Sequence, residues 1–261
     1  MKDDPAMTAP NGIPTPASIL RRRIVLRVLK GAEPGRVLEI GCGRGDLLAR
    51  LASRGWEGVG LEIAPEAAAA ARRAVQPFGP RMTITEDPRA VRETFPLVLA
   101  LEVLEHVRDD EAELQRWLRW MAPGGRLVVT VPAHERYWTG ADEFGGHVRR
   151  YERIPLRRLM ERTGLEIEEL WSFGFPLTAL TVPLRALLYR RRLRTVEHLS
   201  REARVLRSSF DSTRQAPAAF IASAAVESVG LFFHVLQLGF LRTDLGASYL
   251  VACRRPALHP G

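Results

Sequence analysis

The stretch Val37-Leu38-Glu39-Ile40-Gly41-Cys42-Gly43-Arg44-Gly45 decides the fold of this chain. Its first half is apolar and β-branched, which predicts a buried strand. Three glycines then alternate with other residues, directly before a helical pattern over residues 45–54. Glycines at a strand-to-helix turn let the backbone take positive φ and approach a ligand closely. The free amides at the start of the helix favour electron-rich ligand atoms. The stretch therefore predicts a ligand-binding turn.

The spacing of these glycines separates two kinds of ligand. Dinucleotide-binding folds use G-x-G-x-x-G at this place, whereas the third glycine here comes one position earlier. Glu39 stands two residues before the first glycine. Its carboxylate would repel a pyrophosphate and attract an ammonium group. The turn therefore favours a ligand with an amino group over NAD.

Short apolar runs alternate with helical patterns on both sides of this turn. Strands are predicted over residues 36–40, 58–63, 81–85, 97–102, 126–131, 165–173 and 246–253. Helices are predicted over residues 18–30, 45–54, 65–75, 109–121 and 155–163. This alternation favours right-handed crossovers and a mainly parallel sheet with both faces covered. The predicted fold class is α/β, doubly wound, with about seven strands and an insertion before the last one.

The same stretch resembles motif I of the class I SAM-dependent methyltransferases (SAM is S-adenosyl-L-methionine), a family with a Rossmann-like fold. A second string follows the fourth predicted strand and is similar to the motif that small-molecule methyltransferases of this family carry there: Leu101-Glu102-Val103-Leu104-Glu105-His106-Val107. Where the family often has Phe-Asp, the chain has Phe95-Pro96. The resemblance covers residues 37–173 and the final strand. It implies a seven-stranded, mostly parallel sheet with an antiparallel last strand, SAM as methyl donor and S-adenosylhomocysteine as product.

The resemblance also implies which residues hold SAM. Glu39 would lie near the amino group of the cofactor, and Gly41, Gly43 and Gly45 would form the floor beneath its methionine part. Glu62 ends the second strand, 17 residues after Gly45, where the family carries an acid that binds the ribose hydroxyls. NAD enzymes carry an acid there too, so this residue does not discriminate between the cofactors.

The remaining implied cofactor contacts follow the third and fourth strands. Asp87 is similar in position to the acid that faces the adenine amino group, and Glu86 is the competing choice. The match is loose because Pro88 stands where a small residue is usual. The predicted cofactor-binding set is completed by Cys42, Ile63, Glu102 and Val103.

The methyl acceptor is expected near the long loop at residues 132–154. Ligands of open α/β sheets bind beyond the carboxyl ends of the strands, and this loop follows the fifth strand. Long loops of this kind are often functional, and the aromatic content argues against disorder. Its end resembles a block found in some bacterial class I methyltransferases. The predicted acceptor-binding residues are Tyr137, Trp138, Arg149, Arg150 and Tyr151.

The chemistry of the acceptor decides which side chains are needed. A hydroxyl acceptor requires a base, and histidine suits neutral pH. The candidates, in order, are His147, His106 and His134, with a structural or helix-capping role for His147 as the alternative. A carboxylate acceptor needs no base, and Arg149 or Arg150 would then hold its oxygens in bidentate fashion. No metal is predicted, because the two cysteines lie far apart at no metal-ligand spacing.

The domain organisation follows from the break in pattern after residue 174. We expect a flexible tail at 1–17, a methyltransferase domain at 18–174 and 246–255, and an apolar and basic insertion at 175–245. Residues 216–241 are apolar, but Glu227 near their middle argues against a bilayer span. Three interpretations stay open: a cap over the acceptor, a homodimer interface, or peripheral contact with a membrane. All three favour a small-molecule or lipid-like acceptor.

Charge leaves other functions open but does not favour them. The net charge is +8 and the pI near 10.4, which permits nucleic-acid binding, yet almost all of the excess is arginine. A nucleic-acid (RNA) methyltransferase is one alternative. Adenine and cytosine N-methylating enzymes carry Asn/Asp-Pro-Pro-aromatic after strand four, and this chain does not, so a nucleic-acid partner is disfavoured. A non-catalytic methyltransferase-fold partner protein is the other alternative. A cytoplasmic location is expected, with or without contact to the inner face of the membrane.

Overall fold

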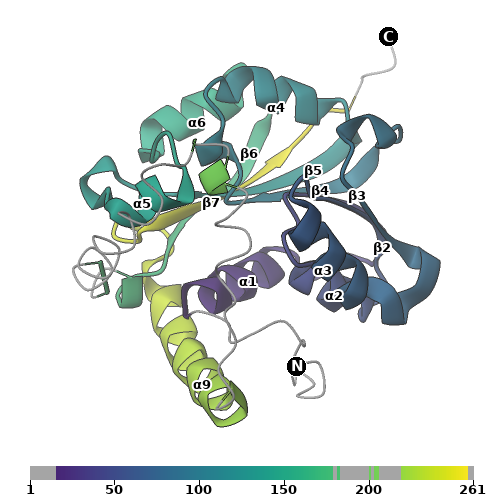
Figure 1. The fold of residues 1–261 in the computed structure, drawn as a ribbon. Helices are drawn as coiled ribbons and strands as arrows, with labels where there is room; N and C mark the ends of the chain where they lie inside the picture. The colour runs from purple at the N-terminus through teal and green to yellow at the C-terminus, as the bar shows by residue number, and fades with distance from the viewer. Residues whose placement is uncertain (1–15, 179–180, 183–199, 201–202, 206–218, 258–261) are drawn as a thin grey trace.

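The computed structural model describes residues 16–178, 181–182, 200, 203–205 and 219–257. They form three layers, with one sheet between two layers of helices (Figure 1). The sheet has seven strands in the order β3-β2-β1-β4-β5-β7-β6. The strands are β1 (Arg36–Ile40), β2 (Glu57–Leu61), β3 (Met82–Thr85), β4 (Phe95–Leu101), β5 (Met121–Pro132), β6 (Glu166–Phe173) and β7 (Ser248–Arg254). This is the order of a doubly wound sheet that reverses between β1 and β4, the point where such folds bind ligands.

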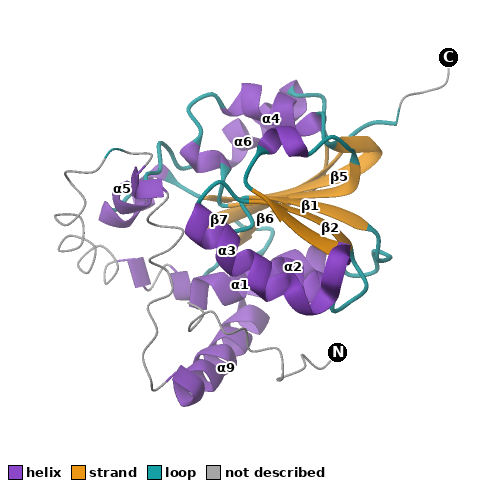
Figure 2. Cartoon of the chain, turned by 45° about the vertical axis from the view of Figure 1, so that its right-hand side comes forward, coloured by secondary structure: helices purple, strands orange, loops and turns teal. Residues whose placement is uncertain are grey.

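Helices cover both faces of the sheet (Figure 2). The helices are α1 (Pro16–Val28), α2 (Asp46–Ala52), α3 (Pro65–Val75), α4 (Asp110–Leu118), α5 (Gly140–Gly145), α6 (Arg153–Arg162) and α9 (Ala219–Gln237). Apolar residues of α4 and α6 pack on one face, and those of α1, α2 and α3 on the other. Short 3₁₀ turns lie at Gln76–Arg81, Pro88–Ala90, Leu104–His106, Glu135–Tyr137 and Leu238–Phe240.

Strand direction agrees with the sequence prediction. β1 to β5 pair in parallel, and β7 runs antiparallel to both β5 and β6. Burial on both faces explains why the central strands are apolar throughout: Val98, Leu99 and Ala100 of β4 are all fully buried. The predicted Rossmann-like sheet with an antiparallel last strand is confirmed.

Two local differences from the predicted elements have clear causes. The strand β4 begins at Phe95 rather than 97, and its register with β5 shifts between Phe95 and Leu97. Pro96 falls in this irregularity, where a missing amide donor costs no ladder bond. The helix α4 ends at Leu118, three residues earlier than predicted, because Met121 already pairs with Phe95 in the sheet.

The insertion between β6 and β7 is helical where it is described. It contributes α9, which packs against α1, and the short turn that follows. Within the described residues, no helix combines the length and apolar character needed to cross a bilayer. The predicted tail up to residue 15, residues 183–199 and most of the basic stretch at 190–215 lie outside the described residues.

Candidate functional site

The loops with the predicted functional residues gather at the carboxyl edge of the parallel strands. The glycine turn follows β1, Glu62 follows β2, the E-V-L-E-H string follows β4, and residues 133–152 follow β5. Parallel strands end on the same side of the sheet, so these four segments share one edge. The β5 segment is not a plain loop, because it contains α5 and a 3₁₀ turn.

All three glycines of the turn have positive φ. The φ values are +66° at Gly41, +54° at Gly43 and +78° at Gly45. A methyl group at Gly41 would collide with Val103, and one at Gly45 would press on the backbone of Ala71. At Gly43, by contrast, a Cβ would meet nothing within 4 Å. Two glycines are therefore required by packing, and the third turns its open side toward space that a ligand can fill.

Glu62 holds the glycine turn from the neighbouring strand. One carboxylate oxygen accepts the amide of Gly43 at 2.9 Å and the other accepts the amide of Ala64 at 2.8 Å. Its side chain is buried, and this burial raises the pKa of Glu62, while the two amides act in the opposite direction. The acid predicted for the ribose hydroxyls thus also fixes the position of the central glycine.

Glu39 is a buried acid without a partner for one oxygen. It is 4% exposed, and its Oε2 atom has no hydrogen bond. Burial, followed by the charges of Asp46 and Glu62, raises the pKa of Glu39 to about 8. A buried polar atom of this kind is costly unless a ligand satisfies it. The ammonium group of SAM has the charge and the donors that this oxygen lacks, so the residues present fit that cofactor.

This raised pKa predicts that SAM binds more tightly as the pH rises. Glu39 is mostly protonated at pH 6, and an ammonium ligand binds its carboxylate form. Between pH 6 and pH 7 the SAM affinity is therefore expected to increase by up to about tenfold per unit. This range stays below the usual α-amino pKa near 7.7–8.0, so the ligand keeps its charge. Calorimetric titration at several pH values measures the slope, and Glu39→Gln should flatten it.

The other predicted cofactor contacts lie around the same edge. Glu102 has φ of +57°, accepts the hydroxyl of Thr130 at 3.1 Å and pairs with Arg21 of α1 at 3.4 Å. Asp87 caps the 3₁₀ turn after β3 by accepting the amide of Arg89, and its competitor Glu86 forms an ion pair with Arg72. Cys42 is buried, Ile63 is exposed, and Val103 packs on Gly41.

His147 is placed by the short helix that precedes it. Asp142 lies in the first turn of α5, and Gly146 ends the helix with φ of +77°, which directs the chain back. The amide of His147 bonds to the carbonyl of Asp142, and its Nδ1 lies 2.9 Å from the carboxylate Oδ1 of the same residue. The ring of His106 lies across that of His147 at 4.9 Å between centroids. Two of the three predicted bases therefore meet.

Asp142 is ionised and tightly held. Burial alone would raise its pKa, but the bonds to His147 and Arg150 outweigh it and lower the pKa of Asp142 to about 2. The guanidinium of Arg150 binds both carboxylate oxygens, at 2.9 and 3.0 Å. A carboxylate at Nδ1 selects the tautomer with Nδ1–H, which leaves the lone pair of His147 on Nε2. The arrangement fixes the orientation of the His147 ring.

The buried pair of Asp142 and Arg150 leads to a stability prediction. Asp142→Asn leaves the Arg150 guanidinium, 7% exposed, without its charge partner, so the free energy of unfolding should fall by about 3 kcal/mol. The matched change Glu93→Gln removes the charge partner of Arg36, whose side chain is 48% exposed, and should cost at most about 1 kcal/mol. Urea denaturation of both variants measures the difference. Equal losses of unfolding free energy would show that the buried ion pair stabilises the fold no more than the exposed one.

Glu105 is the least expected member of the site. It is fully buried, neither carboxylate oxygen has a hydrogen bond, and Oε1 lies 3.9 Å from Nε2 of His147. Burial, then the charge of Glu102, raises its pKa well above the usual value. Ligand atoms of Glu105, His106 and His147 all lie within 4.8 Å of one another, so these three residues could hold a cation. No metal is predicted from the sequence, in which His147 lies far from Glu105 and His106.

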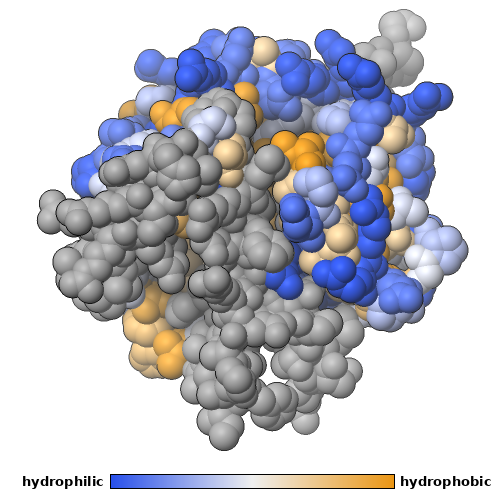
Figure 3. All heavy atoms as spheres, viewed as in Figure 1, coloured by the Kyte–Doolittle hydropathy of each residue, from blue (hydrophilic) through white to orange (hydrophobic). Residues whose placement is uncertain are grey.

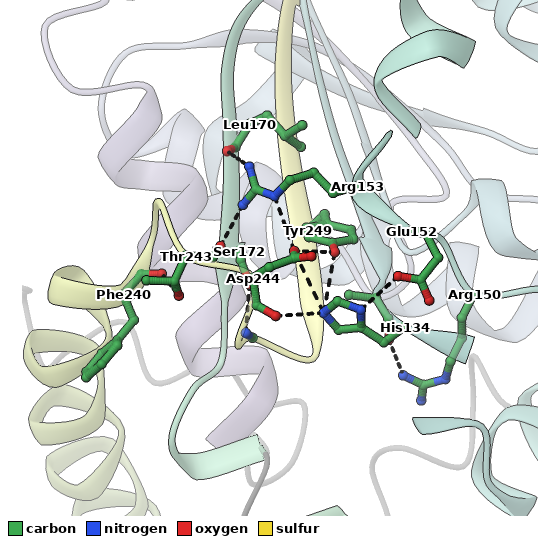
Figure 4. A network of polar contacts seen from close by, with 12 residues as sticks. His134, Arg150, Glu152, Arg153, Leu170, Ser172, Phe240, Thr243, Asp244 and Tyr249 are labelled. Atoms are coloured by element: carbon green, nitrogen blue, oxygen red, sulfur yellow. Dashed lines mark hydrogen bonds and ion pairs between the residues drawn. The ribbon is translucent and has the colours of Figure 1, made fainter. Parts of the chain in front are cut away.

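His134 lies in a different polar network, shown in Figure 4. Its Nδ1 contacts Glu152 at 2.9 Å, and its Nε2 contacts the carbonyl of Asp244 at 3.0 Å. The hydroxyl of Tyr249 approaches the same Nε2, and Arg153 binds Asp244 at 3.2 Å. His134 is 3% exposed, and both ring nitrogens are engaged. This network joins the loop after β5 to the end of the insertion, and Arg150, which also binds the carbonyl of Ala133, links it to Asp142.

The predicted acceptor-binding residues divide into two groups. Tyr137 and Trp138 are half-buried, Tyr137 edge-on to His134 and Trp138 within 3.4 Å of Glu143. The other three are held by the protein itself: Arg150 by Asp142, and Arg149 and the Tyr151 hydroxyl by Asp110.

Comparison with known proteins agrees with this geometry. A family model described as a methyltransferase domain matches residues 17–170, more than half of the chain. The chain belongs to this methyltransferase family. SAM is the methyl donor of its class.

The relatives and solved structures add detail at different levels. A ubiquinone biosynthesis O-methyltransferase of Cereibacter sphaeroides is 39% identical over 100 residues, covering 37% of this methyltransferase and 40% of that relative. The matches span about half or less of the lengths of the curated relatives. A putative methyltransferase from Bacillus halodurans has a TM-score of 0.56 at 14% identity, over 90% and 99% of the two chains. Haemonchus contortus phosphoethanolamine N-methyltransferase 2 with bound SAM has a TM-score of 0.54 at 18% identity, over 93% and 54%. Both structures show the same fold.

Proposed function

We propose that this methyltransferase transfers the methyl group of SAM to a hydroxyl oxygen of a small, amphipathic acceptor. The observation that carries the proposal is the oriented histidine: Asp142 holds Nδ1 of His147 beside the E-V-L-E-H string that follows β4. A hydroxyl acceptor needs a base, and the site offers one. The curated relatives are O-methyltransferases of ubiquinone biosynthesis, which supports oxygen as the acceptor atom.

The residues around the glycine turn would hold the cofactor. Glu39 would bind its amino group, Gly43 would lie beneath it, and Glu62 would meet its ribose. When bound, SAM supplies a methyl group activated by a sulfonium, so alignment of the acceptor is the main task left to the protein.

His147 would act on the acceptor proton. Its Nε2 atom would take the proton from the hydroxyl, and the imidazolium formed would be stabilised by the Asp142 carboxylate at Nδ1. Arg150 would keep Asp142 ionised and fixed throughout. Glu105 lies near Nε2, and its raised pKa would favour the neutral carboxyl group, which adds no competing negative charge.

The other candidates fit this chemistry less well. His106 would serve as a wall of the site beside His147, and His134 as a structural residue, since both of its nitrogens are engaged. A carboxylate acceptor bound by Arg149 or Arg150 would have to displace Asp110 or Asp142 first. These existing ion pairs favour the hydroxyl.

The insertion at 175–245 would supply the acceptor-facing cap of the methyltransferase domain at 18–174 and 246–255. Its end contacts the loop after β5 through Asp244 and His134, close to Tyr137. An apolar cap suits an acceptor with an alkyl tail. A homodimer through the insertion remains an alternative role for the same segment.

Methyl transfer from isotope-labelled SAM tests the proposal. A panel of alkyl catechols, an alkyl amine, a fatty acid and a bulk RNA would be incubated with the purified protein, and products identified by mass. Labelled methyl ether on the catechols, with faster transfer for longer alkyl tails, is the expected result. Transfer only to the amine, to the fatty acid or to RNA would overturn the proposal.

A further inference from the structure

One face of α9 is apolar and open to solvent. Ser228, Val229, Leu231, Phe232, Val235 and Leu236 are exposed, whereas Gly230 and Gln237 are buried. At 3.6 residues per turn the exposed positions occupy about half of the helix circumference. Figure 3 shows apolar atoms at the lower left, where Figure 1 places α9. A contiguous apolar face of this kind marks an interaction surface.

The helix that packs on the opposite, buried side of α9 carries positive charge. α1 packs against α9 and contains Arg23 and Arg27. Burial lowers the pKa of His234 on α9, and the charges of these two arginines lower it further. Arg27 and, after α9, Arg242 are exposed. Residues 228–237 of α9 contain no acid, and Glu227 directly precedes them. An exposed apolar face on a helix with arginines close by is the composition of surfaces that bind anionic lipid.

The same contact leads to the candidate active site. Gly230 packs so closely on Ile19 of α1 that a Cβ there would lie 2.7 Å from its side chain. Two residues further along α1, Arg21 pairs with Glu102 at the carboxyl end of β4. The apolar face is therefore joined through one helix to the edge of the sheet that holds the glycine turn.

We propose that α9 docks this methyltransferase on an anionic lipid surface, with its exposed side chains among the acyl chains and the α1 arginines at the headgroups. A lipid surface fits better than a second copy of the chain. The chain carries a net charge of +8, so a second copy would add more positive charge, whereas anionic headgroups would neutralise it. Docking in this place would present the edge of the sheet to acceptors with alkyl tails.

Vesicle flotation of the full chain, without SAM or acceptor, tests docking independently of methyl transfer. The protein should float with vesicles of mixed phosphatidylglycerol and phosphatidylcholine and not with phosphatidylcholine alone, and high salt should reduce binding. The double change Phe232→Ser with Val235→Ser should weaken lipid affinity by at least about tenfold. Ile154→Ser is the matched control, since Ile154 is 62% exposed against 65% and 61% for the α9 residues.

Charge reversal forms the second arm. Arg27→Glu with Arg242→Glu should abolish flotation, whereas Arg119→Glu with Arg158→Glu, on the exposed surface of the α4 and α6 layer, should leave it unchanged. Thermal melting confirms that each variant folds. Failure of the wild type to float, equal flotation on neutral vesicles, or unchanged binding of the α9 variant would overturn the proposal. A wild-type dimer that the α9 variant converts to monomer would assign the face to a second copy instead.

Discussion

Replacing His147 with alanine is expected to reduce turnover by about 10²–10⁴-fold, the usual contribution of a general base, while the affinity for SAM stays the same. The two quantities separate because His147 lies in the segment after β5, whereas the glycine turn and Glu62 follow β1 and β2. Its Nε2 is the nitrogen left to accept a proton once Asp142 holds Nδ1. Steady-state turnover on a hydroxyl acceptor and calorimetry with SAM measure the two effects.

The neighbouring histidine provides the control for this change. His106→Ala removes a ring from the same contact without removing the oriented base, so its effect on turnover should be the smaller one. The assays should be repeated with a chelator and with added divalent cation, because Glu105, His106 and His147 could hold one. Equal losses in the two variants, or a chelator effect as large as that of His147→Ala, would contradict the assignment of His147 as the base.

Gly43→Val should abolish tight SAM binding, with an expected loss of at least about a hundredfold in affinity. The added side chain would project into the space that is open at Gly43, where no protein atom lies within 4 Å. A β-branched residue also strains a backbone with φ of +54°, at a cost of about 1–2 kcal/mol. The first effect blocks the ligand and the second lowers stability.

Gly79→Val separates these two effects. Gly79 has φ of +61° and the same open surroundings, but it lies in the turn after α3, which carries none of the proposed cofactor contacts. Gly79→Val should lower the stability in denaturant titration as well, because φ of 61° with ψ of −145° strains a valine, and only Gly43→Val should lose SAM. If Gly79→Val weakened SAM binding as much as Gly43→Val, the loss would come from strain and not from the cofactor site.

Local patterns account for the parts of the fold that could be predicted. The strand at 36–40 and the helix at 65–75 have the predicted bounds, because apolar periodicity and a proline at the helix start act within a few residues. The bounds of β4 and β5 differ because they depend on pairing between Phe95 and Met121, which neither segment encodes alone.

The candidate site was predictable to the extent that it lies in single segments. Glu39 and the glycines are read from one turn, whereas the bond from Glu62 to Gly43 requires two strands in register. The burial of Glu105 comes from the segment after β5, whose Val148 amide bonds to its carbonyl. The contact of His134, a candidate base, with Asp244 could not be predicted, because His134 and Asp244 lie 110 residues apart in the sequence.

Calorimetric titration of the wild-type chain with SAM, and separately with NAD, tests the central claim most directly. A methyltransferase with its cofactor site at the glycine turn should bind SAM at a single saturable site and show no binding of NAD. Heat of binding with NAD and none with SAM, or no binding of either, would contradict the assignment of this turn, Glu39 and Glu62 to the methyl donor.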